Sequence, residues 1–159
     1  MNVFVGQDGT FSAVLFNGEY KLVTKDGNGP WVNKRDTVTI NLNKHSEVNL
    51  EVVPYFTISN KQLTVSGSTM VASFTINQIV ETASISRVML LLSKTQFADD
   101  VNNIFRQDIT ENLSAGTVSF NADISGNADV PKAKALYARV GVLANGANQA
   151  IYSSVIRIK

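Results

Sequence analysis

The sequence predicts an all-β protein that consists of two sandwich modules, and three observations support this fold class. Apolar and polar residues alternate over much of the chain, which is typical of strands with one buried face. Asn-Gly and Asp-Gly pairs stand between several of these segments, and both residue types tolerate the positive φ of tight turns. Pro54 separates two alternating segments, which indicates a joint. We therefore expect one module at residues 1–53 and a second at residues 54–159.

The N-terminal module is expected to contain four strands, with a fifth around Val3–Val5. Asn17-Gly18 would join the first two of the four as a hairpin. A module of this size buries only a thin core, so it is expected to pack on its neighbour or on further residues. The four predicted strands are Thr10–Phe16, Glu19–Val23, Thr37–Leu42 and Val48–Val53.

The C-terminal module shows seven alternating segments, the strand number of an immunoglobulin-like sandwich. These segments are Thr57–Val65, Met70–Ile76, Val88–Leu92, Phe105–Leu113, Val118–Ile124, Leu136–Val142 and Tyr152–Ile158. Val88–Leu92 is apolar on both faces, which indicates a central strand or one beneath another element. The residues expected to share one core are Phe74, Leu90, Leu92, Val118, Phe120, Val140, Val142 and Ile156.

One segment of the C-terminal module has the spacing of a helix. Phe97, Val101, Ile104 and Phe105 fall on one face of a helical period, and Thr95 is suited to cap its first turn. A short amphipathic helix or helical turn is predicted there.

Charge and composition exclude several classes of partner. The 159 residues include 14 basic and 13 acidic ones, so nothing steers the chain toward nucleic acid or an anionic membrane. Cysteine is absent, which excludes disulfides and thiolate metal sites. No signal segment follows Met1, and no apolar run approaches the ~18 residues of a membrane helix. The chain as given is expected to be intracellular, or a mature or trimmed form.

The sequence offers little catalytic chemistry, so we expect no enzyme, no cofactor and no metal site. His45 is the sole histidine and lies between two predicted strands, where a solvated turn residue is expected. Nucleotide-binding and nucleophile motifs are absent. Asp26-Gly27-Asn28-Gly29 resembles the start of a calcium loop, but Thr37 stands where that loop needs Glu. Candidate carboxylates for a glycosidase pair, read instead as solvated acids, are Asp8, Asp26, Asp99, Asp100, Asp108 and Asp123.

Trp31 is the candidate binding residue. It is the single tryptophan and follows the Gly- and Asn-rich segment Asp26–Pro30. An indole in such a loop presents a flat apolar face and an N–H group, which suit stacking on a sugar or anchoring a protein. The alternative is that Trp31 folds back and fills a small core.

Several segments, in their order along the chain, resemble those of one protein family. They are Asp8–Phe11, Phe16–Lys21, Gly29–Trp31, Val52–Ile58, Leu136–Val142 and Tyr152–Ile156. Over nearly its whole length the chain is similar to a family of uncharacterised Bacteroidetes outer-surface lipoproteins. In that family a transthyretin-like, carboxypeptidase-regulatory-like module precedes a fibronectin type III-like module, and the genes neighbour polysaccharide-uptake systems.

The resemblance implies a location and two functions. It implies an extracytoplasmic protein on the outer-membrane surface that binds glycan for an uptake system, with other surface proteins of that system as partners. The alternative is a structural or adhesive spacer that mediates protein contacts. The family has further strands upstream of Val3, so the N-terminal module is expected to be incomplete. Its open sheet edge is expected to pair with a second copy or to pack on the C-terminal module.

Overall fold

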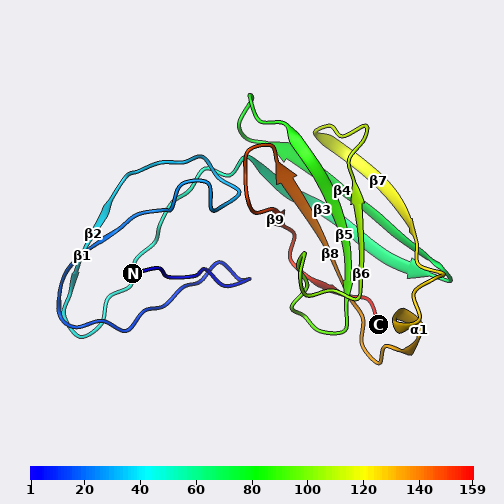
Figure 1. The fold of residues 1–159 in the computed structure, drawn as a ribbon, viewed down its shortest axis with the longest axis horizontal. Coiled ribbons are helices and arrows are strands. Elements are labelled where there is room, and N and C mark those ends of the chain that lie inside the picture. The colour runs from blue at the N-terminus through cyan, green and yellow to red at the C-terminus, as the bar shows by residue number, and fades with distance from the viewer. The chain divides into compact units, whose positions relative to one another are not determined.

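The computed structural model describes residues 1–159 and is nearly all-β, which confirms the expected fold class. Its one helix is the short α1, Asp129–Lys132, and no helix has the length and hydropathy to cross a membrane. The chain divides into two compact units (Figure 1). Met1–Asp26 and Asn33–Val52 form the N-terminal unit, and Gly27–Val32 and Val53–Lys159 form the C-terminal unit.

The C-terminal unit is a sandwich of two antiparallel sheets (Figure 1). The first sheet has the order β3-β4-β7, with bounds Phe56–Ser66, Thr69–Gln78 and Gly116–Asp123. The second has the order β10-β8-β5-β6, and β9 also pairs with β8. Its strands are β5 (Ile85–Ser93), β6 (Phe105–Ile109), β8 (Tyr137–Ala144), β9 (Ile151–Tyr152) and β10 (Ile156–Arg157).

All seven strands predicted for this unit are present, and the last is split into β9 and β10. The break lies at Ser153, where a side chain replaces part of the ladder. The Val140 amide donates to Ser153 Oγ at 3.2 Å rather than to a backbone carbonyl. Ser153 Oγ in turn donates to the carbonyl of Ser154. A hydroxyl that competes with the backbone in this way interrupts regular pairing.

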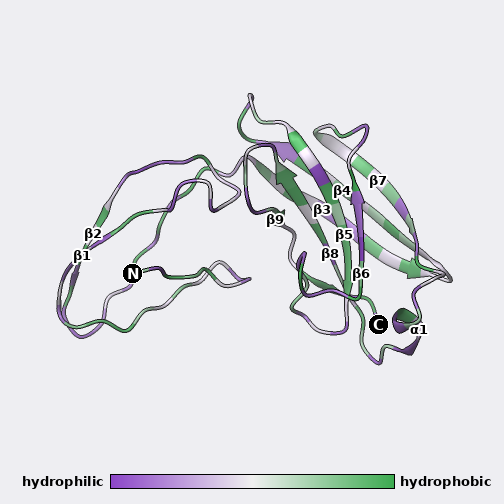
Figure 2. Ribbon diagram, viewed as in Figure 1, coloured by the Kyte–Doolittle hydropathy of each residue, from purple (hydrophilic) through white to green (hydrophobic).

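The predicted core is confirmed. Alternate residues of the strands point between the two sheets, and Figure 2 shows hydrophobic and hydrophilic residues alternating along β4 and β7. The fully buried members of the expected set are Phe74, Leu90, Leu92, Val140 and Val142. The remaining three, Val118, Phe120 and Ile156, are partly buried against this cluster.

The run Val88–Leu92 is buried on both faces, as its sequence predicts. Met89 and Leu91 point to the outer face of the second sheet, where they form a smaller cluster with Ala150, Leu143 and Tyr152. Gly141 makes this packing possible. A Cβ there would lie 2.8 Å from both Met89 Cε and Tyr152 Cε1, so only glycine leaves these side chains room.

The helix predicted around Phe97 is wrong, and residues 94–104 form an irregular loop instead. Asp99 explains the difference. Its Oδ1 atom accepts hydrogen bonds from the amides of Val101 and Asn102, at 2.9 and 2.6 Å, which closes a local turn. A side chain that satisfies its own neighbours in this way competes with a helix.

The N-terminal unit has one sheet, in which β1 (Gly18–Leu22) pairs antiparallel with β2 (Val38–Leu42). The predicted strands at Glu19–Val23 and Thr37–Leu42 are thereby confirmed. Those at Val3–Val5, Thr10–Phe16 and Val48–Val53 are wrong, because these segments are irregular. Val14 and Phe16 are 101% and 92% exposed, while Phe11, Leu15, Val48 and Leu50 are half-buried without pairing into a sheet.

Asn17-Gly18 does not join two paired strands as predicted. Asn17 Oδ1 instead accepts a hydrogen bond from the amide of Lys44, which ties the start of β1 to the end of β2.

No apolar side chain of the N-terminal unit is buried. Every buried apolar residue of the chain stands at Phe56 or later. The exposed large apolar side chains of this unit are Met1, Phe4, Val5, Val14, Phe16, Val23 and Val52. One face of the β1–β2 sheet is half-buried and carries Tyr20, Leu22, Val38, Ile40 and Leu42.

Candidate functional site

Loops at one end of the C-terminal sandwich form a continuous surface around Trp31. We name it the Trp31 surface and define it by four segments: residues 27–32, residues 53–55, the β4–β5 loop 79–84 and the β8–β9 loop 145–150. In an immunoglobulin-like sandwich, loops that cluster at one end are a common place for binding.

Backbone hydrogen bonds hold residues 30–32 against residues 53–55. The Tyr55 amide donates to the carbonyl of Pro30 at 3.0 Å, and the Val32 amide donates to the carbonyl of Val53 at 2.9 Å. Trp31 faces Pro54 between these bonds as an isolated antiparallel bridge. Trp31, although distant in sequence, therefore belongs to the C-terminal unit.

The Trp31 side chain is half-buried and lies against Gly29. A Cβ on Gly29 would come within 2.2–2.5 Å of three atoms of the indole, so the absence of a side chain there makes room for the ring. Indole Nε1 is buried and has no hydrogen-bond partner. The N–H group therefore does not reach the surface, and what the ring can offer a ligand is apolar contact.

The two strand-connecting loops of the Trp31 surface are fixed by amide side chains. Gln78 Nε2 donates to the carbonyls of Val80, Glu81 and Ala83 at 3.2, 2.8 and 2.9 Å. In the other loop, Asn145 donates to Ser84 from both its backbone and its side chain. Both loops are thus pre-formed, which lowers the entropy lost when a ligand binds.

Three exposed amide side chains complete this surface. Asn28, Asn148 and Gln149 make no side-chain hydrogen bond within the chain. Asn148 Nδ2 lies 3.7 Å from the Cβ position of Gly27, so the loops that carry these residues lie side by side. An amide both donates and accepts, which suits the hydroxyl groups of an uncharged sugar.

Trp31 is predicted from the sequence as a binding residue, whereas these amides are not. Asn145–Asn148 has the signature of a turn, which by itself indicates no binding residue. The available signal is the concentration of Asn and Gln in Asn145–Gln149, where three of the five residues are amides.

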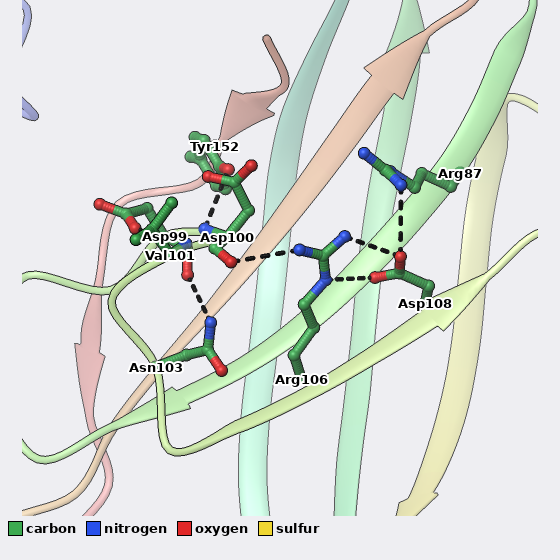
Figure 3. A network of polar contacts seen from close by, with 8 residues as sticks. All are labelled: Arg87, Asp99, Asp100, Val101, Asn103, Arg106, Asp108 and Tyr152. Atoms are coloured by element: carbon green, nitrogen blue, oxygen red, sulfur yellow. Dashed lines mark hydrogen bonds and ion pairs between the residues drawn. The ribbon is translucent and has the colours of Figure 1, made fainter.

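A second polar cluster lies on the outer face of the sheet that contains β5, β6 and β8 (Figure 3). Arg106 holds Asp108 through two contacts of 2.7 Å, and Arg87 Nη1 lies 3.4 Å from the same carboxylate. Arg106 also donates to the carbonyl of Asp100 at 3.1 Å. The Asp100 amide donates to the Tyr152 hydroxyl at 3.3 Å.

Arg139 holds the 94–104 loop on this face. It is buried and donates to the carbonyls of Ser153 and Ala98, each at 2.8 Å. Its guanidinium lies 4.6 Å from the centre of the Tyr152 ring, a cation–π distance. Burial lowers the pKa of Arg139. The loop is therefore anchored by its backbone, while Phe97 remains 59% exposed.

The structure brings three of the six candidate carboxylates near one another and leaves three apart. Asp99, Asp100 and Asp108 border the outer-face cluster, and the hydrogen bond from Arg106 lowers the pKa of Asp108. No three His, Cys, Asp or Glu residues are grouped to hold a metal ion. Each of the other three candidates contacts a local partner: Asp8 with Thr10, Asp26 with Arg35, and Asp123 with Ser125.

His45 lies in the irregular segment that follows β2. Its side chain is 82% exposed, and Nε2 stands 3.6 Å from Glu47 Oε1. Both residues belong to the N-terminal unit, whereas the Trp31 surface and the outer-face cluster belong to the C-terminal unit.

The partly buried phenol of Tyr152 makes the free energy of unfolding fall at alkaline pH. Burial raises its pKa to about 12, above the value of about 10 in an unfolded chain. Because the folded state favours the neutral phenol, this contribution is complete below about pH 10 and is lost as pH rises through about 12. We expect urea denaturation to show falling stability over that window. Tyr152→Phe should lack this component and the Tyr137→Phe control should retain it; parallel curves for all three proteins would contradict the assignment.

The chain matches two family models. The N-terminal domain model described as "Protein of unknown function (DUF3823)" matches residues 1–53, and the "Domain of unknown function (DUF3823_C)" model matches residues 56–157. No curated protein matches the chain.

Solved structures share the fold over nearly the whole chain. A DUF3823 family protein from Parabacteroides merdae ATCC 43184 is 71% identical, with a TM-score of 0.95 over 99% of this chain and 78% of that one. A DUF3823 family protein from Bacteroides ovatus ATCC 8483 is 30% identical, with a TM-score of 0.85 over 98% and 81%. A third, described as "a putative carbohydrate binding protein" from Bacteroides uniformis ATCC 8492, is 17% identical, with a TM-score of 0.74 over 99% and 81%.

Proposed function

The chain belongs to the DUF3823 family, and we propose that it is a non-catalytic cell-surface module that binds a neutral glycan for a polysaccharide-uptake system. The observation that carries this function is the Trp31 surface. There an indole lies among exposed amides that have no partner within the chain. Aromatic and amide side chains together suit the two sides of a sugar, its apolar C–H face and its hydroxyl edge.

Two further points support this function. The Bacteroides uniformis protein described above as a carbohydrate binder shares the fold, although at 17% identity that likeness carries no site chemistry. The resemblance to surface lipoproteins next to uptake genes supports an extracytoplasmic location and a transthyretin-like origin for the N-terminal unit. It also supports other surface proteins of that system as partners.

A glycan array probed with the purified chain tests this function. Trp31→Ala should weaken retention on any glycan that the wild-type binds by about tenfold or more, since a central aromatic contact is commonly worth that much. Phe97→Ala is the matched control, because it removes an exposed aromatic ring from a different surface. Equal retention by wild-type and Trp31→Ala, or no glycan retained by the wild-type, would contradict the site.

Gly29→Ala tests the same site without removing the indole. The new methyl group would overlap the ring, so the indole must move. Because the chain has one tryptophan, its fluorescence reports this movement directly. We expect a shifted emission maximum together with weakened glycan retention. A shifted maximum with full retention would show that the ring position does not matter to binding.

The second candidate function is a structural or adhesive spacer that mediates protein contacts. The exposed apolar side chains of the N-terminal unit favour it, because large apolar groups left in water mark interaction surfaces. The glycan array separates the two candidates, since a spacer retains no glycan and is indifferent to Trp31.

A further inference from the structure

We propose that Glu81 is a further binding residue of the Trp31 surface, where its carboxylate accepts hydrogen bonds from glycan hydroxyls and repels glycans that carry acidic groups. This role rests on the proposed glycan binding, and it identifies the residue that selects uncharged glycans over acidic ones.

Glu81 carries the only charge of the Trp31 surface. The four segments that define this surface contain no lysine, arginine, histidine or aspartate, and no second glutamate. The Glu81 side chain is exposed and forms no hydrogen bond or ion pair within the chain. Its negative charge is therefore not neutralised by a neighbour in these segments and is available to a ligand.

Hydrogen bonds to Tyr55 bring Glu81 close to Trp31. The Tyr55 amide donates to the carbonyl of Pro30 at 3.0 Å, and the Tyr55 carbonyl accepts from the Val80 amide at 3.4 Å. Trp31 directly follows Pro30 in the chain, and the residue after Val80 is Glu81. Because consecutive Cα atoms are only about 3.8 Å apart, both side chains start from one small area, and one oligosaccharide can contact both.

The backbone of Glu81 is fixed before a ligand binds. Its carbonyl accepts a hydrogen bond from Gln78 Nε2 at 2.8 Å, and the same nitrogen also donates to the carbonyls of Val80 and Ala83. None of these bonds involves the carboxylate. The carboxylate is therefore free to bind while the loop that carries it is already ordered, which limits the entropy lost on binding.

A carboxylate complements the exposed amides of this surface. It has two acceptor oxygens and no donor, so it can accept from two adjacent hydroxyl groups of one sugar. Hydrogen bonds to a charged acceptor are stronger than those between neutral groups. A carboxylate or sulfate group on the glycan would instead face a like charge and have no proton to donate. The same side chain thus favours uncharged glycans and disfavours acidic ones.

Isothermal titration calorimetry at low ionic strength tests this role with two matched probes. The first is the neutral glycan that the wild-type chain retains best on the array. The second is the same glycan after its primary hydroxyls are oxidised to carboxylates. The wild-type should bind the neutral probe about tenfold more tightly than the oxidised one, because only the latter meets a like charge.

Glu81→Gln keeps the size of the side chain and removes its charge. This variant should bind the neutral probe about tenfold more weakly than the wild-type, since charge-assisted hydrogen bonds are lost, and it should show little preference between the probes. Glu81→Lys should prefer the oxidised probe, and added salt should reduce the differences between the two probes. Glu111→Gln is the matched control, because it removes the same charge from the β6–β7 loop, which is not part of the Trp31 surface.

Three results would each overturn the role of Glu81. They are an unchanged preference in Glu81→Gln, an unchanged affinity of that variant for the neutral probe, and equal effects of Glu81→Gln and Glu111→Gln. Glycan binding itself would stand in these cases if Trp31→Ala still weakens it. An array on which the wild-type retains no glycan would overturn the proposed function and the role of Glu81 together.

Discussion

Replacing Phe74 with alanine should lower the free energy of unfolding of the C-terminal unit by about 3–5 kcal/mol. Phe74 is fully buried, and its ring centre lies 6.0 Å from that of Phe120 at an interplanar angle of 43°. The substitution removes the ring from the space between the two sheets and leaves a cavity that close-packed neighbours fill only in part. The total free energy of unfolding of a domain is commonly about 5–15 kcal/mol, so this loss is a large fraction of it.

Urea denaturation followed by far-ultraviolet circular dichroism measures this loss. Phe97→Ala is the matched control, since the same atoms are removed from a ring that is largely in water. The control should change stability by no more than about 0.5 kcal/mol. Equal effects at the two positions would mean that the β3-β4-β7 sheet does not pack as described.

Replacing Arg139 with methionine should cost about 2–4 kcal/mol, because two buried carbonyls lose their donor. Methionine keeps much of the apolar stem of Arg139 but none of its N–H groups. The carbonyls of Ala98 and Ser153 would then have to find water or remain unpaired. We expect the 94–104 loop to detach from the sheet before the rest of the unit unfolds.

Hydrogen exchange resolves this local effect, with faster exchange expected at the amides of Val101 and Asn102 and little change in β4. Arg157→Met is the control, since Arg157 is an exposed arginine that donates to the carbonyl of Lys159. Unchanged exchange in the loop of Arg139→Met would show that the Asp99 turn holds it without the arginine.

The sequence predicts the sandwich well because its strands pack on one another. In β4 and β7 each apolar residue meets a buried surface, so the period of two is a direct record of the fold. The N-terminal unit has the same pattern at Thr10–Phe16, but this segment pairs with no strand and none of its side chains is fully buried. Alternating apolar residues indicate which side chains can share one buried face. They do not indicate whether another element packs on that face.

The helix at Phe97 shows a different limit. Its apolar spacing is real, yet Asp99 accepts hydrogen bonds from the neighbouring amides. Arg139, 41 positions after Ala98 in the chain, also holds the loop by donating to the Ala98 carbonyl. Neither contact leaves a periodic signal. At the candidate site, Trp31 can be recognised from the sequence because it is the single tryptophan. The exposed amides cannot, because they form one surface only when loops distant in sequence come together in the fold.

The candidate binding residue Trp31 and the strands of the sandwich that displays it come from different parts of the sequence. Residues 27–32 leave the N-terminal unit, pair beside Pro54 and return, so Trp31 is contributed by a segment that precedes the boundary between the two family models. A gene exchange at that boundary would keep all eight strands of the sandwich and replace the tryptophan. Ligand preference could thus be inherited from one parent and the fold that displays it from the other.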